Sequence, residues 1–350
     1  MTAAVLAGIG ACLPATAVPN EELVSWWADR PGTTSVDAGW ISSRTGIRSR
    51  HVVAPGEATS DLAVTAGRRA LDSAGVRAAG TVVLATNTPD RLSPATAPDV
   101  AARLDLGPVG AFDVGAVCTG FVYALATAAG LIAARITDSV LVIGADAFTT
   151  VLDPDDLTTR AVFGDGAGAV LLRAGTAGEP GALGGFLLGS DGADRELIEI
   201  PGGGSRQRST GLPVKEEDTY FRMRGRPVFA RAVTRMSGAV RHTAEDLGWG
   251  VAGVDRFVLH QANARILAAV ARGLRVPADR FVSNIAEVGN TVAASVPLAM
   301  AAGAATGRLR PGDRVVLAGF GGGLTWGSAA LVWPDLPLPS YDTPDQGGRT

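Results

Sequence analysis

Cysteine and histidine are both scarce in this chain of 350 residues. Two cysteines, Cys12 and Cys118, cannot build a framework of disulfides, and such scarcity is typical of proteins of the reducing cytoplasm. The three histidines lie far from one another and from both cysteines, so no cluster has the spacing of metal ligands. These absences exclude a disulfide scaffold, and they predict a cytoplasmic protein without a metal site.

Long apolar runs and an excess of charge of one sign are also missing. No apolar run reaches the roughly 18 residues that a transmembrane helix needs, and the net charge is only −3. We therefore expect neither a membrane nor nucleic acid as a partner. The apolar start of the chain lacks a basic segment and is broken by Gly8, Gly10 and Pro14, which favours a first β-strand over a signal peptide.

Short β-branched runs alternate with alanine-rich stretches along the rest of the chain. Buried strands are expected over residues 81–85, 139–144, 256–260 and 314–319. Helices rich in small residues, suited to close packing between layers, are expected over residues 122–134 and 293–305. This alternation predicts an α/β fold.

The order of these elements is duplicated, and each half closes on a glycine-rich turn followed by an apolar strand. A repeat of this length predicts two similar domains, residues 1–175 and residues 176–333. The repeat places Cys118 and Asn290 at equivalent points, each ahead of a buried helix. We expect residues 201–217 to form a surface loop and residues 334–350 to form a flexible tail.

Four segments contain residues that could carry chemistry. Cys118 lies between an apolar strand and a helix, where the helix dipole would lower the pKa of its thiol, although a lone cysteine can equally be a small core residue, as we expect for Cys12. His260 ends a strand and Asn290 precedes a helix; the alternatives are a structural histidine and a helix N-cap. The glycines at 321–323 form either a tight turn or an oxyanion-binding loop. The residues alone leave these alternatives open.

Taken together, six motifs resemble the β-ketoacyl-ACP synthase III family of condensing enzymes. They occur in the family's order from the first strand to about Trp333. The motifs are Arg44-Thr-Gly-Ile-Arg48, Val114-Gly-Ala-Val-Cys-Thr-Gly-Phe121, Phe163-Gly-Asp-Gly-Ala-Gly168, His260-Gln-Ala-Asn263, Gly289-Asn-Thr291 and Gly319-Phe-Gly-Gly-Gly-Leu-Thr-Trp-Gly327.

The resemblance implies a thiolase-like, five-layered αβαβα fold of two pseudo-symmetric halves, assembled as a homodimer. Cys118 would carry the acyl group of an acyl-CoA or acyl-ACP starter. His260 and Asn290 would stabilise the enolate that forms as malonyl-ACP loses CO2. The backbone N–H groups of Cys118 and Gly322 would form the oxyanion hole. No cofactor is implied, because coenzyme A and phosphopantetheine thioesters are substrates, and the acyl carrier protein is the implied partner.

Further positions match residues that, in the family, lie along the path by which the substrate reaches the site. The resemblance places Trp40, Arg44, Asn263 and Gly225 along the path of coenzyme A or the pantetheine arm. It also places Arg265 and Arg272 on a helix that docks the acidic carrier protein, where arginines suit an acidic partner.

Three positions depart from the family's pattern. Leu157 stands where an arginine would clamp adenine against Trp40, so an acyl-ACP donor becomes credible. Ser93 stands where a bulky aromatic would reach the partner subunit's acyl pocket, which predicts a primer larger than acetyl and a role in a specialised fatty-acid or polyketide pathway. Thr119 follows the nucleophile in place of alanine, without a derived consequence.

Two rival functions remain on the sequence alone. The first is an acyltransferase that passes the acyl group to a carrier, alcohol or amine without decarboxylation; Asn290 argues against it, because an aspartate would suit such a base. The second is a non-catalytic partner subunit, and Cys118 argues against that because such partners usually lack the nucleophile.

Overall fold

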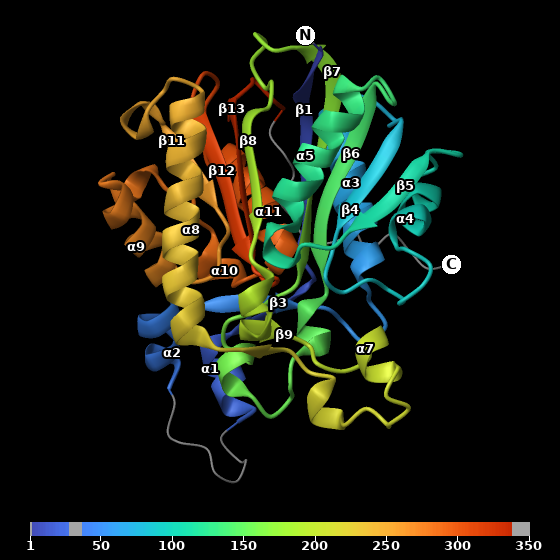
Figure 1. The fold of residues 1–350 in the computed structure, drawn as a ribbon, viewed down its shortest axis with the longest axis vertical. Helices are drawn as coiled ribbons and strands as arrows, with labels where there is room; N and C mark the ends of the chain where they lie inside the picture. Colours follow the sequence, from blue (N-terminus) through green and yellow to red (C-terminus); the bar gives the residue numbers. More distant parts are fainter. Residues whose placement is uncertain (1, 28–36, 338–350) are drawn as a thin grey trace.

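Two β-sheets with the same strand order form the frame of the molecule (Figure 1). The computed structural model describes residues 2–27 and 37–337. The first sheet has the order β1 (Thr2–Cys12), β7 (Gly166–Thr176), β6 (Ser139–Asp146), β4 (Thr81–Ala85) and β5 (Gly110–Val114). The second has the order β8 (Gly184–Ser190), β13 (Thr325–Val332), β12 (Arg314–Gly321) and β11 (Arg256–Leu259).

Two small ribbons and a set of helices complete this part of the chain. The ribbons pair β2 (Thr16–Pro19) with β3 (Ser49–Val52) and β9 (Ile198–Glu199) with β10 (Arg222–Met223). The α-helices are α1 (Asn20–Ser25), α2 (Ala38–Thr45), α3 (Thr59–Ser73), α4 (Ala97–Arg103), α5 (Gly120–Ala133), α6 (Leu157–Arg160), α7 (Ser205–Arg208), α8 (Gly225–Asp246), α9 (Ala264–Leu274), α10 (Ile285–Val288) and α11 (Ser295–Ala305). The 3₁₀ helices are η1 (Val117–Thr119), η2 (Phe148–Val151), η3 (Gly192–Leu197), η4 (Glu216–Asp218), η5 (Val251–Gly253), η6 (Ala278–Arg280) and η7 (Val292–Ala294).

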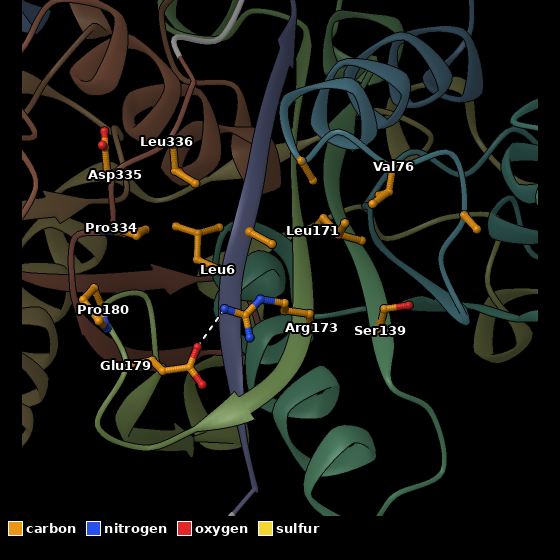
Figure 2. A pocket seen from close by; sticks show the side chains of 13 residues that line it. Leu6, Val76, Ser139, Leu171, Arg173, Glu179, Pro180, Pro334, Asp335 and Leu336 are labelled. Carbon is orange, nitrogen blue, oxygen red and sulfur yellow. Dashed lines mark hydrogen bonds and ion pairs between the residues drawn. The ribbon is translucent and has the colours of Figure 1, made fainter.

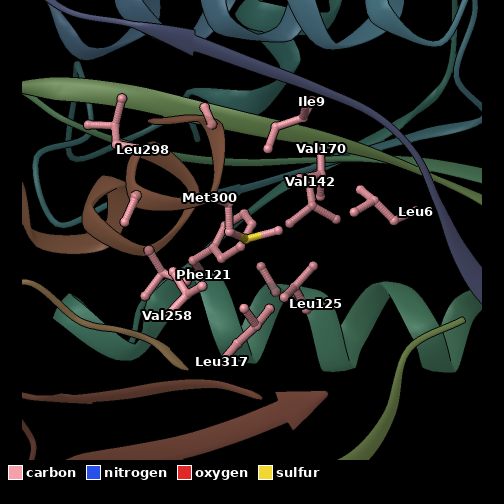
Figure 3. Close-up of a cluster of buried hydrophobic side chains, with 14 of the residues drawn as sticks. Leu6, Ile9, Phe121, Leu125, Val142, Val170, Val258, Leu298, Met300 and Leu317 are labelled. Carbon is pink, nitrogen blue, oxygen red and sulfur yellow. The ribbon is translucent and has the colours of Figure 1, made fainter. Parts of the chain in front are cut away.

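Helices α5 and α11 lie between the two sheets. In Figure 3, Phe121 and Leu125 of α5 and Met300 of α11 pack between Val142 of the first sheet and Leu317 of the second. Helices α3 and α4 cover the outer face of the first sheet, and α8 and α9 cover that of the second (Figure 1). The result is the five-layered αβαβα arrangement expected from the resemblance. In the part of the chain described, no helix is both long and apolar enough to cross a membrane.

The small residues of the central helices are explained by how closely they approach the sheets. A Cβ atom on Gly144 of β6 would lie 2.5 Å from the carbonyl oxygen of Ala293, and one on Gly168 of β7 would lie 2.7 Å from Cβ of Pro297. Such separations are shorter than real Cβ contacts, so only glycine fits at either position. The backbone of η7 and α11 therefore rests directly on the first sheet.

All four predicted strands are present at the expected places, and the two predicted helices are shifted at their starts. Helix α5 begins at Gly120, two residues early, and α11 begins at Ser295, two residues late. The late start arises because Val292–Ala294 adopt the 3₁₀ turn η7. The stretch 201–217 is mostly exposed but contains α7. Of the predicted tail, residues 338–350 lie outside the described residues.

The repeated frame changes one sequence-based equivalence. Both 3₁₀ turns begin at a valine with positive φ, Val117 (46°) and Val292 (51°), directly before α5 and α11. The counterpart of Cys118, the second residue of its turn, is therefore Ala293. The prediction that Asn290 is equivalent to Cys118 was wrong by three residues, because Asn290 precedes its turn. Whether the halves 1–175 and 176–333 are separate domains stays a prediction.

Candidate active site

Cys118 is the middle residue of η1, at the entry to α5. Cys118 is 9% exposed. The end of β12 lies against it, since a Cβ on Gly321 would come within 2.8 Å of the Cys118 backbone nitrogen and 3.0 Å of its Cβ. Glycine at position 321 therefore keeps the space around this backbone N–H free of a side chain.

The thiol of Cys118 is not activated in the way that the sequence suggested. Burial raises its pKa well above the ordinary value, and the nearby carboxylate of Asp146 raises it further, while the N–H of Cys118 itself lowers it. The expectation of a lowered pKa at a helix N-terminus was wrong because desolvation of a thiolate outweighs the helix dipole here. The resting nucleophile is a neutral thiol.

His260 follows β11 directly and continues its ladder, because its N–H donates to the Ala318 carbonyl at 2.8 Å. Its ring is buried, and burial lowers its pKa to about 3, so the imidazole is neutral at physiological pH. Nδ1 lies 2.6 Å from Oγ of Ser295. In the tautomer with Nδ1 accepting from this hydroxyl, Nε2 carries the proton and can donate it to a substrate oxygen.

Asn290 is held by both its backbone and its side chain. Its N–H donates to the carbonyl of Val162 at 2.9 Å, and its own carbonyl accepts from Gly164 at 3.0 Å. The side-chain Oδ1 accepts from the N–H of Val292 at 3.0 Å. Because the oxygen is engaged with the chain, Nδ2 points away from this bond and is the atom that can donate to a ligand. The N-cap alternative was wrong, because Thr291 is the N-cap of η7 and Ala294 is that of α11; the bond from Val292 instead orients the side-chain amide of Asn290.

The fold brings these three residues to one place. Turn η1 lies against both η7 and β12, and Cys118 shares an apolar cluster with Val292. His260 is bonded to Ala318, whose neighbour Gly319 touches the Cys118 carbonyl: a Cβ there would lie 3.4 Å from it. Cys118 of the first half therefore lies at the same junction as His260 and Asn290 of the second half.

The glycine-rich turn is tied to the nucleophile's turn by two threonines. Thr325 Oγ1 lies 3.1 Å from Thr119 Oγ1 and 3.1 Å from the carbonyl oxygen of Gly322. Thr119 Oγ1 in turn donates to the Thr325 carbonyl at 3.2 Å. Thr119, for which the sequence gave no consequence, fixes Gly322 relative to Cys118.

An aromatic cluster borders the thiol. Phe148, Phe163 and Phe221 pack on one another with ring centroids 4.8–5.1 Å apart and belong to the same buried cluster as Cys118. A cavity of about 550 Å³ adjoins this cluster, sharing Val151 and Ile200 with it. The rings occupy the space beside Cys118 within one subunit.

Ser93 lies on an exposed loop between β4 and α4, next to Leu92, which lines the same cavity. Its predicted effect on the partner subunit's acyl pocket stays a prediction. Leu157 begins α6 and packs onto the apolar cluster around Leu23 and Ile41.

Three of the four residues predicted to line the substrate's approach lie on α2 or at the start of α9. Trp40 is exposed, and Arg44, four residues on, stacks over its ring at 4.8 Å. Asn263 caps α9 by accepting from the N–H of Arg265, and its Nδ2 reaches the Arg44 carbonyl at 3.5 Å. Arg272 is exposed in the last turn of α9. This stack gives Trp40 a cation–π partner from its own helix; the loss of an adenine clamp expected from Leu157 stays a prediction.

Gly225 is the first residue of α8, and a Cβ there would meet open space. Nothing in its surroundings requires glycine, so its predicted role along the pantetheine path stays a prediction.

A second cavity, of about 540 Å³, is lined by none of these residues (Figure 2). It lies beside β1 at the end of β7 that is distant from Gly166, the pairing partner of Asp146. Arg173 lines it and pairs with Glu179 at 2.7 Å. Arg173 and Glu179 therefore already satisfy each other in this cavity.

Sequence reasoning missed two residues that act on the candidate site residues without being among them. Ser295 bonds the ring of His260, and Asp146 is a fully buried carboxylate whose charge acts on Cys118. Both had a signal in the sequence. Ser295 lies five residues after Asn290, close to the start of the predicted helix, and Asp146 is the single acidic residue at the end of an otherwise apolar strand.

A five-layered fold with cysteine, histidine and asparagine at the junction of two pseudo-symmetric halves defines a thiolase-fold condensing enzyme. Comparison with known proteins places the chain within that class. Models of the 3-oxoacyl-[acyl-carrier-protein] synthase III family match residues 112–192 and, for its C-terminal part, residues 244–333. The chain is 54% identical over 334 residues to beta-ketoacyl-[acyl-carrier-protein] synthase III 5 of Streptomyces coelicolor, covering 95% of this chain and 98% of that relative.

Solved structures agree. The crystal structure of 3-oxoacyl-(acyl carrier protein) synthase III from Pseudomonas aeruginosa PAO1 has a TM-score of 0.88 at 50% identity, covering 96% of this chain and 99% of that one. The priming β-ketosynthase of the R1128 polyketide biosynthetic pathway has a TM-score of 0.85 at 32% identity, covering 95% and 97%. The chain belongs to the β-ketoacyl-ACP synthase III family and is a condensing acyltransferase.

Proposed function

We propose that Cys118, His260 and Asn290 carry out the two half-reactions of this condensing enzyme. Cys118 Sγ attacks the carbonyl carbon of an acyl thioester, the acyl group moves to sulfur, and the thiol proton leaves with the departing CoA or carrier thiol. Splitting the reaction through this acyl-enzyme replaces one difficult step by two easier ones.

The second half-reaction uses the donors of the C-terminal half. When the carbon–carboxylate bond of malonyl-ACP breaks, CO2 leaves and the electron pair forms an enolate. Nε2 of His260 and Nδ2 of Asn290 donate to the enolate oxygen. The enolate carbon then attacks the acyl carbon, Cys118 leaves as a thiolate and takes up a proton from water, and β-ketoacyl-ACP is released. Backbone N–H groups of Cys118 and Gly322 stabilise the oxyanion, as neutral donors do best in a dry site.

One observation carries this assignment: the short segment 290–295 orients both donors. It contains Asn290, whose oxygen is bound by the chain, and Ser295, which sets the tautomer of His260. Neutral donors suit an enolate, and both remain neutral, since the pKa of His260 is lowered to about 3. This favours decarboxylative condensation over base-assisted acyl transfer to an alcohol or amine.

The test follows both half-reactions separately. Purified protein is incubated with an acyl donor and labelled malonyl-ACP, and acyl-Cys118 is measured by intact mass alongside released CO2. We expect Cys118→Ala to abolish acylation and Asn290→Ala to spare acylation but lose condensation, typically by about 10²–10³ for one lost donor. Cys12→Ala, which removes the other buried thiol, is the matched control and should retain both activities.

The outcomes separate the rival functions. Acyl-enzyme without CO2 release supports transfer without decarboxylation, and neither product supports a non-catalytic partner. Full-rate condensation by Asn290→Ala would refute the role given to that amide.

Partners and assembly complete the proposal. An acyl carrier protein docks at Arg265 and Arg272, and the acyl donor approaches along Trp40, Arg44, Asn263 and Gly225. The enzyme primes a fatty-acid or polyketide pathway in the cytoplasm without a cofactor. It acts as a homodimer through β5, which lies at the edge of the first sheet and has no counterpart in the second.

A further inference from the structure

A carboxylate that the proposed mechanism does not use lies behind the junction of the two halves. Asp146 ends β6 and is fully buried. Its Oδ1 accepts from the N–H of Asn87 at 2.7 Å and from the hydroxyls of Thr88 and Thr86 at 3.2 and 3.3 Å. Its Oδ2 accepts from the N–H of Ala293 at 2.8 Å. Asp146 thereby links the first half to a residue of the second half, 147 positions away.

The polarity of this network favours the ionised carboxylate. Thr86 Oγ1 accepts from the N–H of Thr88, and Thr88 Oγ1 accepts from the N–H of Ala147, so each hydroxyl keeps its own proton to donate to Asp146. A protonated carboxyl would face donors alone. Burial nevertheless raises the pKa of Asp146 to about 7, because desolvation opposes the hydrogen bonds. A buried charge held in this way is costly unless its partners stay in place.

Asp146 binds Ala293, which lies in the middle of the segment 290–295 that orients His260 and Asn290. Ala293 lies between Asn290, whose amide is turned by Val292, and Ser295, whose hydroxyl is bonded to His260. Fixing Ala293 on the first half therefore fixes both donors relative to Cys118, which is carried by that half.

The contact between Asp146 and Ala293 has a counterpart in the first half of the pseudo-symmetric frame. Gly144 touches the carbonyl of Ala293 as Gly319 touches that of Cys118, so the two N–H groups occupy equivalent places. The equivalent of Asp146, two residues beyond Gly144, is Gly321, two residues beyond Gly319. In the second half, the N–H of Ala293 donates to the carboxylate of Asp146. In the first half, Gly321 has no side chain, so the N–H of Cys118 stays open to a substrate oxyanion.

We propose that Asp146 is a positioning residue for the condensation step: its carboxylate anchors the 290–295 segment through Ala293 and so sets His260 and Asn290 against the acyl group on Cys118. Asp146 does not touch substrate. This inference rests on the proposed function, because it assigns decarboxylation and acylation to different halves of the site.

The test compares Asp146→Asn with Asp165→Asn. Asp165 is equally buried and accepts from the backbone N–H and hydroxyl of Thr149 and from the N–H of Val53, all within the first half. In Asp146→Asn the new amide sets N–H groups against backbone N–H groups. We expect CO2 release from preformed acyl-enzyme to fall at least about tenfold while acylation stays within about threefold. Asp165→Asn should change both steps in the same proportion.

A second measurement separates positioning from simple loss of structure. Among the residues described, Asp146 is the titratable group whose charge acts on the Cys118 thiol, and the apolar cluster and the glycines of β12 that pack on Cys118 carry no charge. The ring of His260 is neutral. Removing the negative charge should therefore speed the alkylation of Cys118 by iodoacetamide at pH 9 in Asp146→Asn, and not in Asp165→Asn.

If Asp146→Asn does not fold, Thr86→Val withdraws one donor from Oδ1 and should give a weaker change of the same kind. Equal loss of acylation and decarboxylation in the Asp146 and Asp165 variants, or wild-type rates in Asp146→Asn, would overturn the inference. Failure of the proposed function itself is distinguishable, because wild-type protein would then release no CO2 from malonyl-ACP.

Discussion

Replacing Ser295 by alanine tests how the site selects the donating tautomer of His260. The variant removes the hydroxyl that lies 2.6 Å from Nδ1 and leaves that nitrogen in a buried place without its partner. A buried polar atom left unsatisfied costs about 1–3 kcal/mol, which corresponds to about 5–150-fold in an equilibrium or rate. Without the hydroxyl, the tautomer with the proton on Nε2 is no longer favoured, so donation from His260 to the enolate weakens.

The assay is CO2 release from saturating malonyl-ACP, started from enzyme already acylated on Cys118. We expect a fall of about 5–150-fold in Ser295→Ala, with a much smaller change in the acylation rate, because Cys118 acquires its acyl group without this donor. Ser237→Ala is the matched control: Ser237 is a buried serine of α8 whose hydroxyl has no hydrogen-bond partner among the residues described. It should leave both rates unchanged. A decarboxylation rate within twofold of wild type in Ser295→Ala would refute the tautomer argument.

Three further outcomes follow from the same geometry. Phe221→Leu should open the aromatic wall beside Cys118 and raise the ratio of hexanoyl to acetyl loading by intact mass; an unchanged ratio would remove the wall from acyl selection. Thr119→Val should lose the bonds to Thr325 and lower unfolding free energy by about 0.5–1.5 kcal/mol in urea titrations, together with the acylation rate; unaltered acylation would mean that Gly322 holds its place unaided. Because burial raises the pKa of Cys118, its alkylation by iodoacetamide should still accelerate with pH above pH 9, and a plateau near pH 7 would contradict a neutral resting thiol.

The strands could be predicted because buried parallel strands have both faces covered and therefore read as continuous apolar runs. The helix starts could not, because their first turns are set by contacts from the other half. Ala293 looks like an ordinary helix-forming residue, but its N–H is taken by Asp146, and η7 forms in place of a first α-turn.

The candidate nucleophile and donors were readable from motif order, whereas their protonation was not. A helix N-terminus predicts a lowered thiol pKa, yet the depth at which Cys118 is buried reverses the sign. Burial depends on which segments close over a residue, and for Cys118 these are aromatic side chains and the glycines of β12, distant in the sequence.

The two halves share one frame, and the active site arises where their side chains differ within it. At the start of α5, a Cβ on Gly120 would lie 3.1 Å from Cβ of Ala85, at the end of β4. At the equivalent start of α11, Ser295 is hydrogen-bonded to His260, which takes the place of Ala85 at the end of β11.

The same comparison pairs Ala293, bound to Asp146, with Cys118, which faces Gly321. In the proposed mechanism, one half carries the nucleophile, whose N–H no other described residue occupies, and the other half carries the donors on a segment that a carboxylate anchors. If that division is correct, Gly321→Asp should block acylation, because its Cβ alone would lie 2.8 Å from the backbone nitrogen of Cys118 and take the space that the oxyanion needs. Intact mass after exposure to an acyl donor measures this, and normal acyl loading in Gly321→Asp would show that the N–H of Cys118 does not bind the oxyanion.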